Sequence, residues 1–159
     1  MGAGGSSPEQ DWDALHEPFR PRRARRVAVA VATLQFIVLS AVALILPDDG
    51  PIAFQWYDRA GMIGVAAAVA WFLSRYVLLS AVPSSGGLKV RNLLLGRTVS
   101  WPQIVAVRMG NGDPWVTLDI SDGDVLAVMA IQRADGAFGR SEANRLATLV
   151  AAHSPRTDA

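Results

Sequence analysis

The side chains that most often carry out catalysis are few in this chain of 159 residues. Its two histidines, His16 and His153, lie near opposite ends, and neither has the neighbouring serine, aspartate or glutamate pattern of a catalytic triad or a metal site. No cysteine is present, which excludes disulfides, a thiolate nucleophile and cysteine-based metal sites. At the end of an expected helix, His153 is predicted to interact with the helix dipole rather than to act as a base.

Three aspartates form the pattern D-x-x-D-G-D at Asp119, Asp122 and Asp124, where a cation could bind. The pattern lacks the spacing and the terminal glutamate of an EF-hand, and a turn explains it. Likewise, Gly110-Asn111-Gly112 lacks the strand, lysine and helix context of a phosphate-binding loop. The sequence therefore assigns no catalytic residue, metal ligand, cofactor or small-molecule substrate. We expect a non-enzymatic protein without a nucleic-acid partner.

Basic side chains are the remaining candidates for a binding function. Four lie in expected strands: Lys89, Arg91, Arg97 and Arg108. They could bind anionic lipid headgroups, although the ordinary explanation of such charges is a solvated strand face. A second group flanks the apolar parts of the chain: Arg22, Arg23, Arg25, Arg26 and Arg75. Near an anionic leaflet each basic residue contributes about 1 kcal/mol, but the arginines at the N-terminal side could serve only as a topology signal.

Two long apolar runs precede these strands and predict a transmembrane helical hairpin. The first, about residues 27–46, holds twenty residues without a charge. At roughly 1.5 Å of rise per residue, this run matches a bilayer core of about 30 Å. The second, about residues 60–80, is interrupted by Arg75, whose long side chain can reach the interface beside Trp71 and Tyr76.

Small and polar residues within the runs predict how the two helices pack. Gly61, Gly64, Ala68 and the other alanines of the second run leave a smooth surface on which the first helix can pack closely. Gln35 is the one amide of the first run, and its side chain could form a hydrogen bond with a neighbouring helix.

The charges beside the runs predict that both ends of the chain are cytoplasmic. Five arginines in seven residues, "RPRRARR", precede the first run, whereas residues 47–59 hold three aspartates against one arginine. The positive-inside rule keeps the N-terminus in the cytoplasm, and two crossings return the C-terminal part there. This describes a multi-pass protein of the inner (plasma) membrane. A signal peptide cleaved at Ala41-Val42-Ala43 is the alternative, but the apolar run continues past that site.

After residue 83 the apolar residues recur with a period of two, which predicts a small antiparallel β-sheet. Five strands are counted up to Gln132, and Asp122-Gly123 predicts a type I′ turn between the last two. A helix beginning at Ser141 is expected to cover the apolar face of the sheet. The expected core residues are Val90, Val99, Trp101, Ile104 and Trp115.

The stretch "GGLKVRNLLLGRTVSWPQIVAVRMG" resembles the opening of the bacterial pleckstrin-homology-like (PH-like) domain that follows two membrane spans in actinobacterial membrane proteins. That group includes the low-molecular-weight protein antigen of mycobacteria. The resemblance covers roughly residues 60–135 and is carried by Gly87, Val90, Arg91, Asn92, Arg97, Val99, Trp101, Ile104 and the Asp122-Gly123 turn. It implies a partly open barrel with a capping helix, one or two further strands within Arg133–Gly139, and a membrane location. It implies no reaction.

These features predict an α+β membrane protein in four parts: a mobile basic tail (1–26), a transmembrane hairpin (27–82), a PH-like β-domain with a C-terminal helix (83–153) and a second tail (154–159). Trp12, Leu15 and Phe19 are either scattered apolar residues of the first tail or one amphipathic turn on the membrane surface. The domain is expected to bind an unknown membrane or cytoplasmic protein. An anionic-lipid-sensing module and an accessory subunit of an envelope complex are the alternatives.

Overall fold

The computed structural model describes residues 15–47 and 53–153, which form two compact units. The first unit, the helical unit, is Arg23–Leu78. The second, the β-domain, joins the described residues that precede Arg23 to the chain from Leu79 onward. The chain therefore leaves the β-domain at Arg22, forms the helical unit, and re-enters the β-domain at Leu79.

The helical unit consists of two helices, each long and apolar enough to span a membrane. Helix α2 is Arg23–Ile45, and α3 is Trp56–Ser74, followed by the 3-10 turn η1 at Arg75–Leu78. Each helix begins four residues before the apolar run that predicted it, because polar flanking residues join its first turn. In α3 this turn is capped, since the Asp58 carboxylate accepts the backbone N–H of Gln55 at 2.9 Å.

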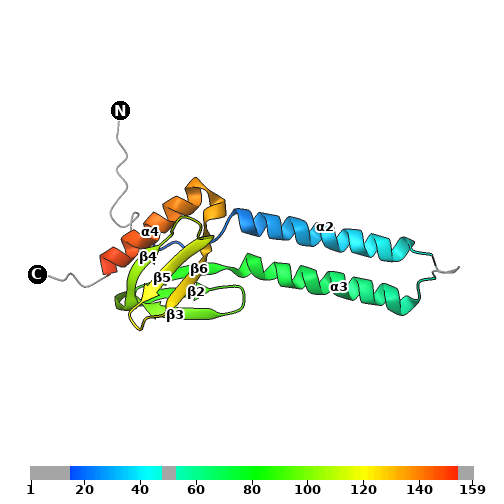
Figure 1. Cartoon of the computed structure of the whole chain (residues 1–159), viewed down its shortest axis with the longest axis horizontal. Helices are drawn as coiled ribbons and strands as arrows, with labels where there is room; N and C mark the ends of the chain where they lie inside the picture. Colours follow the sequence, from blue (N-terminus) through cyan, green and yellow to red (C-terminus); the bar gives the residue numbers. More distant parts are fainter. Residues whose placement is uncertain (1–14, 48–52, 154–159) are drawn as a thin grey trace, which may run out of the picture. The chain divides into compact units, whose positions relative to one another are not determined.

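Of the small residues predicted to pack, an alanine and not the glycines is buried within this helix pair, whose members run side by side (Figure 1). Ala43 of α2 and Ala66 of α3 are fully buried. By contrast, a Cβ atom added at Gly61 or Gly64 would meet no atom within 4 Å, so the glycine face is not packed. The Gln35 side-chain oxygen is buried without a hydrogen-bond partner in the described structure. The predicted small-residue packing therefore holds at Ala66 but not at the two glycines, and the Gln35 side-chain oxygen forms no hydrogen bond within this helix pair.

The β-domain contains six strands in two antiparallel sheets. Sheet A has the order β1 (Ser80–Ser84), β2 (Gly87–Arg91), β3 (Gly96–Ser100), and sheet B the order β4 (Ile104–Arg108), β5 (Trp115–Ile120), β6 (Val125–Gln132). Strand β1 was not predicted, because residues 80–82 were assigned to the end of the transmembrane hairpin (27–82). In the structure Pro83 pairs with Leu88 on an edge strand, where a missing N–H is tolerated.

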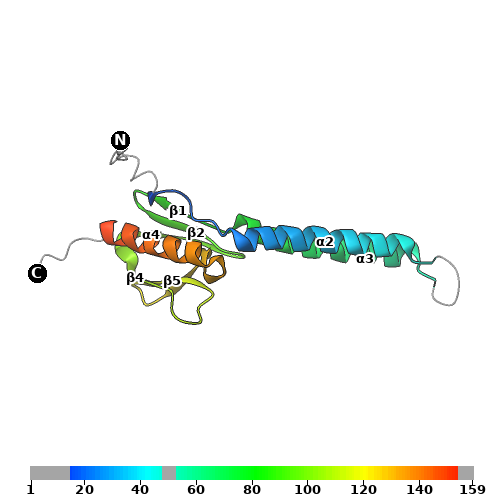
Figure 2. The same cartoon turned by 90° about the horizontal axis from the view of Figure 1, so that it is seen from above.

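The two sheets share one hydrophobic core, which helix α4 (Ala137–His153) covers (Figures 1 and 2). Alternate β5 residues face this core, and α4 contributes Leu146 and Leu149, which are fully buried. The α+β architecture is thus confirmed, with two open sheets rather than a closed barrel. No strand lies within Arg133–Gly139, where the resemblance implied one or two. A 3-10 turn, η3 (Arg133–Asp135), and the first turn of α4 take that place.

The hairpin between β5 and β6 has a three-residue loop, between Ile120 and Asp124, and is not the predicted type I′ turn. The Ile120 N–H donates to the Asp124 carbonyl, and the Gly123 N–H donates to the Ile120 carbonyl, both at 2.9 Å. Within this turn, Gly123 is the one residue with a positive φ, of 89°. A type I′ turn requires two such residues, whereas a three-residue loop ending in a left-handed glycine requires one.

Asn92, directly after β2, connects the two sheets. Its amide nitrogen donates to the Ala127 carbonyl at 2.7 Å, and its amide oxygen accepts the Met129 N–H at 3.2 Å. The Asn92 side chain therefore provides hydrogen-bond partners for two backbone groups of β6, as a neighbouring strand would. The short connection η2 (Trp101–Gln103) joins the sheets along the chain, and Pro102 lies in it as the sequence indicated.

Candidate functional site

The four strand residues predicted as a basic binding surface do not share one face. Lys89 and Arg91 are exposed and alternate with buried residues of β2, so they lie on the outer face of sheet A. Arg97 of β3 pairs directly with Val90, and directly opposed residues share a face. Arg97 therefore lies on the inner side of sheet A, opposite to Lys89 and Arg91.

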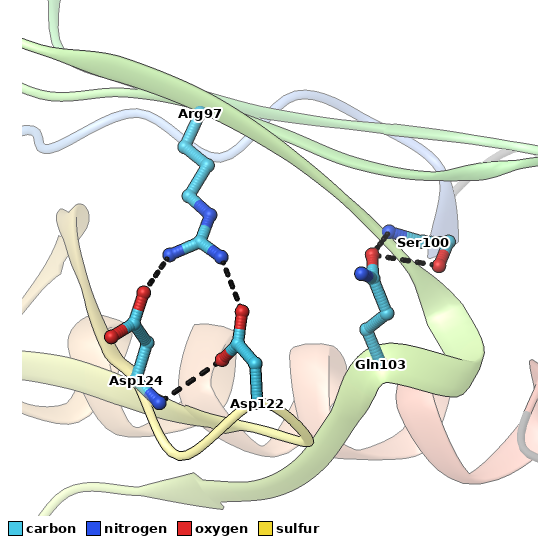
Figure 3. A network of polar contacts seen from close by, with 5 residues as sticks. All are labelled: Arg97, Ser100, Gln103, Asp122 and Asp124. Carbon is cyan, nitrogen blue, oxygen red and sulfur yellow. Dashed lines mark hydrogen bonds and ion pairs between the residues drawn. The ribbon is translucent and has the colours of Figure 1, made fainter.

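Arg97 forms the centre of a charged network that joins the sheets at one corner (Figure 3). Its guanidinium lies 2.8 Å from the Asp124 carboxylate and 2.9 Å from the Asp122 carboxylate. These two hydrogen bonds, to Asp124 first, raise the pKa of Arg97 above its ordinary value. The pKa of Asp122 is lowered, chiefly because its carboxylate accepts the backbone N–H of Asp124 and also faces Arg97. The aspartate cluster is therefore a turn that holds an arginine.

Arg108 is also neutralised locally, because it forms an ion pair with Asp119 of the adjacent strand β5. Lys89 and Arg91 differ, since neither forms an ion pair with any residue that the structure describes. Of the predicted binding surface, only these two side chains remain available to an external anion.

The flanking arginines fall into both units. Arg23, Arg25 and Arg26 are exposed in the first turn of α2. Arg75 begins η1, with its guanidinium 5.9 Å from the centre of the Trp71 ring. Arg22 instead belongs to the β-domain: its backbone N–H donates to the Asp135 carboxylate at 3.0 Å, and its guanidinium lies 3.7 Å over the Phe138 ring.

Residues 15–22, here called the N-terminal segment, pack into the β-domain, although the sequence predicted a mobile tail over residues 1–26. Phe19 is fully buried in the core, and Leu15 packs against it. The backbone of Phe19 exchanges two hydrogen bonds with Ala81 of β1, at 2.8 and 3.1 Å. Residues 1–14, including Trp12, lie outside the described residues.

Arg145 of α4 fixes the N-terminal segment from the other side. One guanidinium nitrogen donates to the carbonyls of Leu15 and Glu17, each at 2.9 Å, and the guanidinium lies 3.7 Å over the Phe19 ring. Glu142 forms an ion pair with Arg145 at 2.7 Å and orients it. The sequence signal for this attachment was the apolar spacing of Leu15 and Phe19, which was interpreted as a membrane-surface turn or as scattered tail residues.

The two histidines, far apart in the sequence, meet beside Trp101. The His16 and His153 rings are 5.7 Å apart edge to face, and His153 stacks on Trp101 at 4.7 Å. Trp101 is buried and donates its indole N–H to the Ser84 carbonyl at 2.9 Å. This arrangement packs the N-terminal segment against α4. It was not predicted, because nothing local in the sequence relates residue 16 to residue 153.

Of the other expected core residues, three are buried in the core and one is not. Val90, Val99 and Ile104 lie in the core with Trp101, whereas Trp115 is only half-buried and lies outside it. Trp115 alternates with the buried residues of β5, so its side chain faces away from the core. Within the described ranges, no group of three or more histidine, aspartate or glutamate side chains could hold a metal ion.

Comparisons with known proteins agree with this architecture. Residues 79–148 match the family described as "Bacterial PH domain". The uncharacterized protein Rv1417 of Mycobacterium tuberculosis is 32% identical over 150 residues, which cover 91% of this chain and 93% of that protein. The uncharacterized protein Mb1452 of Mycobacterium bovis shows the same identity and coverage. No solved structure matches the chain significantly.

The match to the bacterial PH domain begins at residue 79, where the chain re-enters the β-domain. The match to the mycobacterial proteins extends over both units. The chain therefore belongs to the family of these mycobacterial proteins, and its residues 79–148 form a bacterial PH domain.

Proposed function

We propose that this protein is a membrane-anchored, non-enzymatic PH-like module that binds another protein at the cytoplasmic face of the inner membrane. One observation carries the anchoring: the N-terminal segment and the chain from Leu79 onward belong to one folded unit. Both apolar helices therefore start from and return to the same domain. A hairpin that crosses a bilayer twice has this connectivity, since its two ends lie on one side of the membrane.

The charge distribution supports the proposed cytoplasmic side. Arg23, Arg25 and Arg26 stand at the end of α2 that adjoins the β-domain, and basic residues favour the cytoplasmic side. The alternative of a cleaved signal peptide loses support for a structural reason. Cleavage near Ala43 would separate Phe19 from the core that it fills and from Ala81, its backbone partner.

Protein binding is supported by an available sheet edge. In the described structure β3 pairs with β2 and has no strand on its other side. Exposed edges accept extended peptides, which gain main-chain hydrogen bonds from the strand. The β1 edge already binds an extended segment of the chain itself, through Phe19. A tether to the membrane raises the effective concentration of the domain for other membrane proteins.

A photo-crosslinking experiment in intact cells tests this proposal. A photoreactive amino acid would replace Thr98, which is exposed on β3, and in the control protein Thr148, which is exposed on α4. We expect one reproducible protein adduct from position 98 that is absent from position 148. No protein adduct from position 98, or the same adducts from both positions, would contradict protein binding at this edge.

Recognition of anionic lipids is the second candidate, favoured by the exposed and unpaired Lys89 and Arg91. Replacing both residues with glutamine tests it, whereas replacing Arg97 or Arg108 would disrupt ion pairs of the fold. If lipid binding is the function, position 98 forms lipid adducts only, and the double variant loses them.

A further inference from the structure

The tip of the β2–β3 hairpin, Asn92–Leu95, exposes two adjacent leucines. Leu94 is 77% exposed and Leu95 is 81% exposed, more than any other large apolar side chain described in the β-domain. The tip is an ordered turn, since the Asn92 N–H donates to the Leu95 carbonyl at 2.9 Å and the Asn92 side chain is bound to β6. Single exposed apolar residues are common on protein surfaces, but an apolar pair on a fixed tip indicates a contact with an apolar partner.

Strand register places this tip at the end of sheet A where β1 begins, the strand that follows the second apolar helix in the chain. Arg91, the last residue of β2, pairs with Ser80, the first residue of β1. The hairpin tip therefore extends beyond the end of sheet A at which β1 begins. Ser80 is only two residues after Leu78, the last residue of η1. Followed along the chain and across the Ser80–Arg91 pair, the path from Leu78 to either leucine is at most about 25 Å long.

We infer that Leu94 and Leu95 insert into the interfacial region of the same bilayer that α2 and α3 cross. This inference rests on the membrane anchoring proposed above. It adds a second contact between the β-domain and the membrane, one that involves side chains rather than the connecting chain.

Charge favours a lipid surface over a protein as the partner of this tip. Arg91 adjoins the tip and is exposed, and Lys89 lies on the same outer face two residues before it. Neither forms an ion pair within the described structure. Apolar side chains beside unpaired basic ones match an anionic membrane interface, where the acyl boundary accepts leucine and the headgroups accept arginine. Only Leu79 lies between η1 and β1, so the connection to the second apolar helix is short.

Membrane insertion of the tip would orient the β-domain. The other hairpin of sheet A, between β1 and β2, turns at Ser85-Gly86 at the opposite end of the same strands. With one end of sheet A fixed at the bilayer, Ser85 lies away from it. The two tips thus provide an internal comparison within one sheet.

The absence of cysteine allows a site-specific label to test the inference in the full-length protein. Single variants Leu94→Cys, Leu95→Cys, Ser85→Cys and Phe36→Cys would each carry an environment-sensitive fluorophore. Each protein would be reconstituted into vesicles of phosphatidylglycerol and phosphatidylcholine that contain quencher-labelled lipids. Phe36 lies within α2 and reports whether the helices are in the bilayer. The labelled leucine and serine positions are all exposed turn residues, so labelling should leave the fold intact.

We expect quenching at position 36, and quenching at positions 94 and 95 at least about two-fold greater than at position 85. Quenching at 36 with no difference between 85 and either leucine position would overturn the inference and leave the anchoring intact. An absence of quenching at position 36 would instead contradict the anchoring on which the inference rests.

Discussion

At the scale of single residues, Phe19 is the most informative position. It places a fully buried ring in the core of a domain whose strands begin only at residue 80, and it lies before both apolar helices in the chain. Its backbone bonds to Ala81, and Arg145 covers its ring. These contacts make the N-terminal segment a structural part of the β-domain.

Replacing Phe19 with alanine should therefore destabilise the β-domain strongly. Truncating a buried phenylalanine costs about 3–5 kcal/mol, because apolar contacts are lost and a cavity remains. The free energy of unfolding of the full-length protein in detergent, followed by near-ultraviolet circular dichroism, measures this effect. Arg20→Ala, at an exposed neighbouring position, is the control and should change the free energy of unfolding by less than about 0.5 kcal/mol. Equal effects of the two substitutions would show that the segment is not part of the core.

Asp122 should make the stability of the β-domain depend on pH in the acidic range. Its pKa in the folded protein is below the ordinary value of 3.8, because the Asp124 N–H and Arg97 favour its charged form. Its contribution is therefore fully present above pH 3.8, and it decreases as the pH falls from there through the lower folded pKa.

Unfolding of the original protein and of Asp122→Asn, compared between about pH 6 and pH 2, tests this dependence. We expect the original protein to be the more stable at the upper end and the difference to shrink on acidification. A difference that stays constant over the whole range would contradict a lowered pKa.

At the scale of elements, the close approach of α4 to the end of β6 depends on Gly139. A Cβ atom at this position would lie 2.0 Å from the backbone oxygen of Gln132, far closer than atoms pack. Replacing a helical glycine with alanine normally stabilises a helix by about 1 kcal/mol. At Gly139 the same substitution should instead destabilise the protein, since either α4 or β6 has to move to make room for the methyl group.

Gly139→Ala should thus lower the melting temperature of the protein in detergent. Gly64→Ala is the matched control, because the same substitution in α3 meets open space and should leave the melting temperature unchanged or raise it. A melting temperature that rises for both variants would show that α4 is not packed this closely on β6.

The sequence predicted those elements whose pattern is local. The apolar runs identified α2 and α3, and the alternation of apolar and polar residues identified five of the six strands. Strand β1 was missed because its first residues follow the second apolar run directly and were assigned to the hairpin. Only the pairing order shows an edge strand here, where Pro83 is tolerated.

Long-range contacts limited the prediction of the site. In the sequence, all four basic residues lie alike in expected strands: Lys89, Arg91, Arg97 and Arg108. In the structure, however, Arg97 faces Asp122 and Asp124 of the other sheet's hairpin. Likewise, the burial of Phe19 depends on Ala81 and Arg145, which no local pattern connects to it. Such pairs are determined by tertiary packing, which overrides local periodicity.

At the scale of the whole molecule, one domain is built from chain segments on both sides of a helical hairpin. The N-terminal segment and the chain from Leu79 onward fold together, and the hairpin is inserted between them. In a membrane this arrangement requires an even number of crossings, which two apolar helices provide. In the proposed function, the domain and the β3 edge are then held at one membrane surface.

The most direct test of this account is the location of both chain ends in living cells. Paired reporters, one active only in the cytoplasm and one active only outside it, would be fused before Met1 in one protein and after Ala159 in another. The account predicts cytoplasmic activity from both positions, and the same result in a protein carrying Leu94→Ser and Leu95→Ser, since anchoring depends on the helices. Ends on opposite sides of the membrane, or both ends outside the cytoplasm, would contradict it.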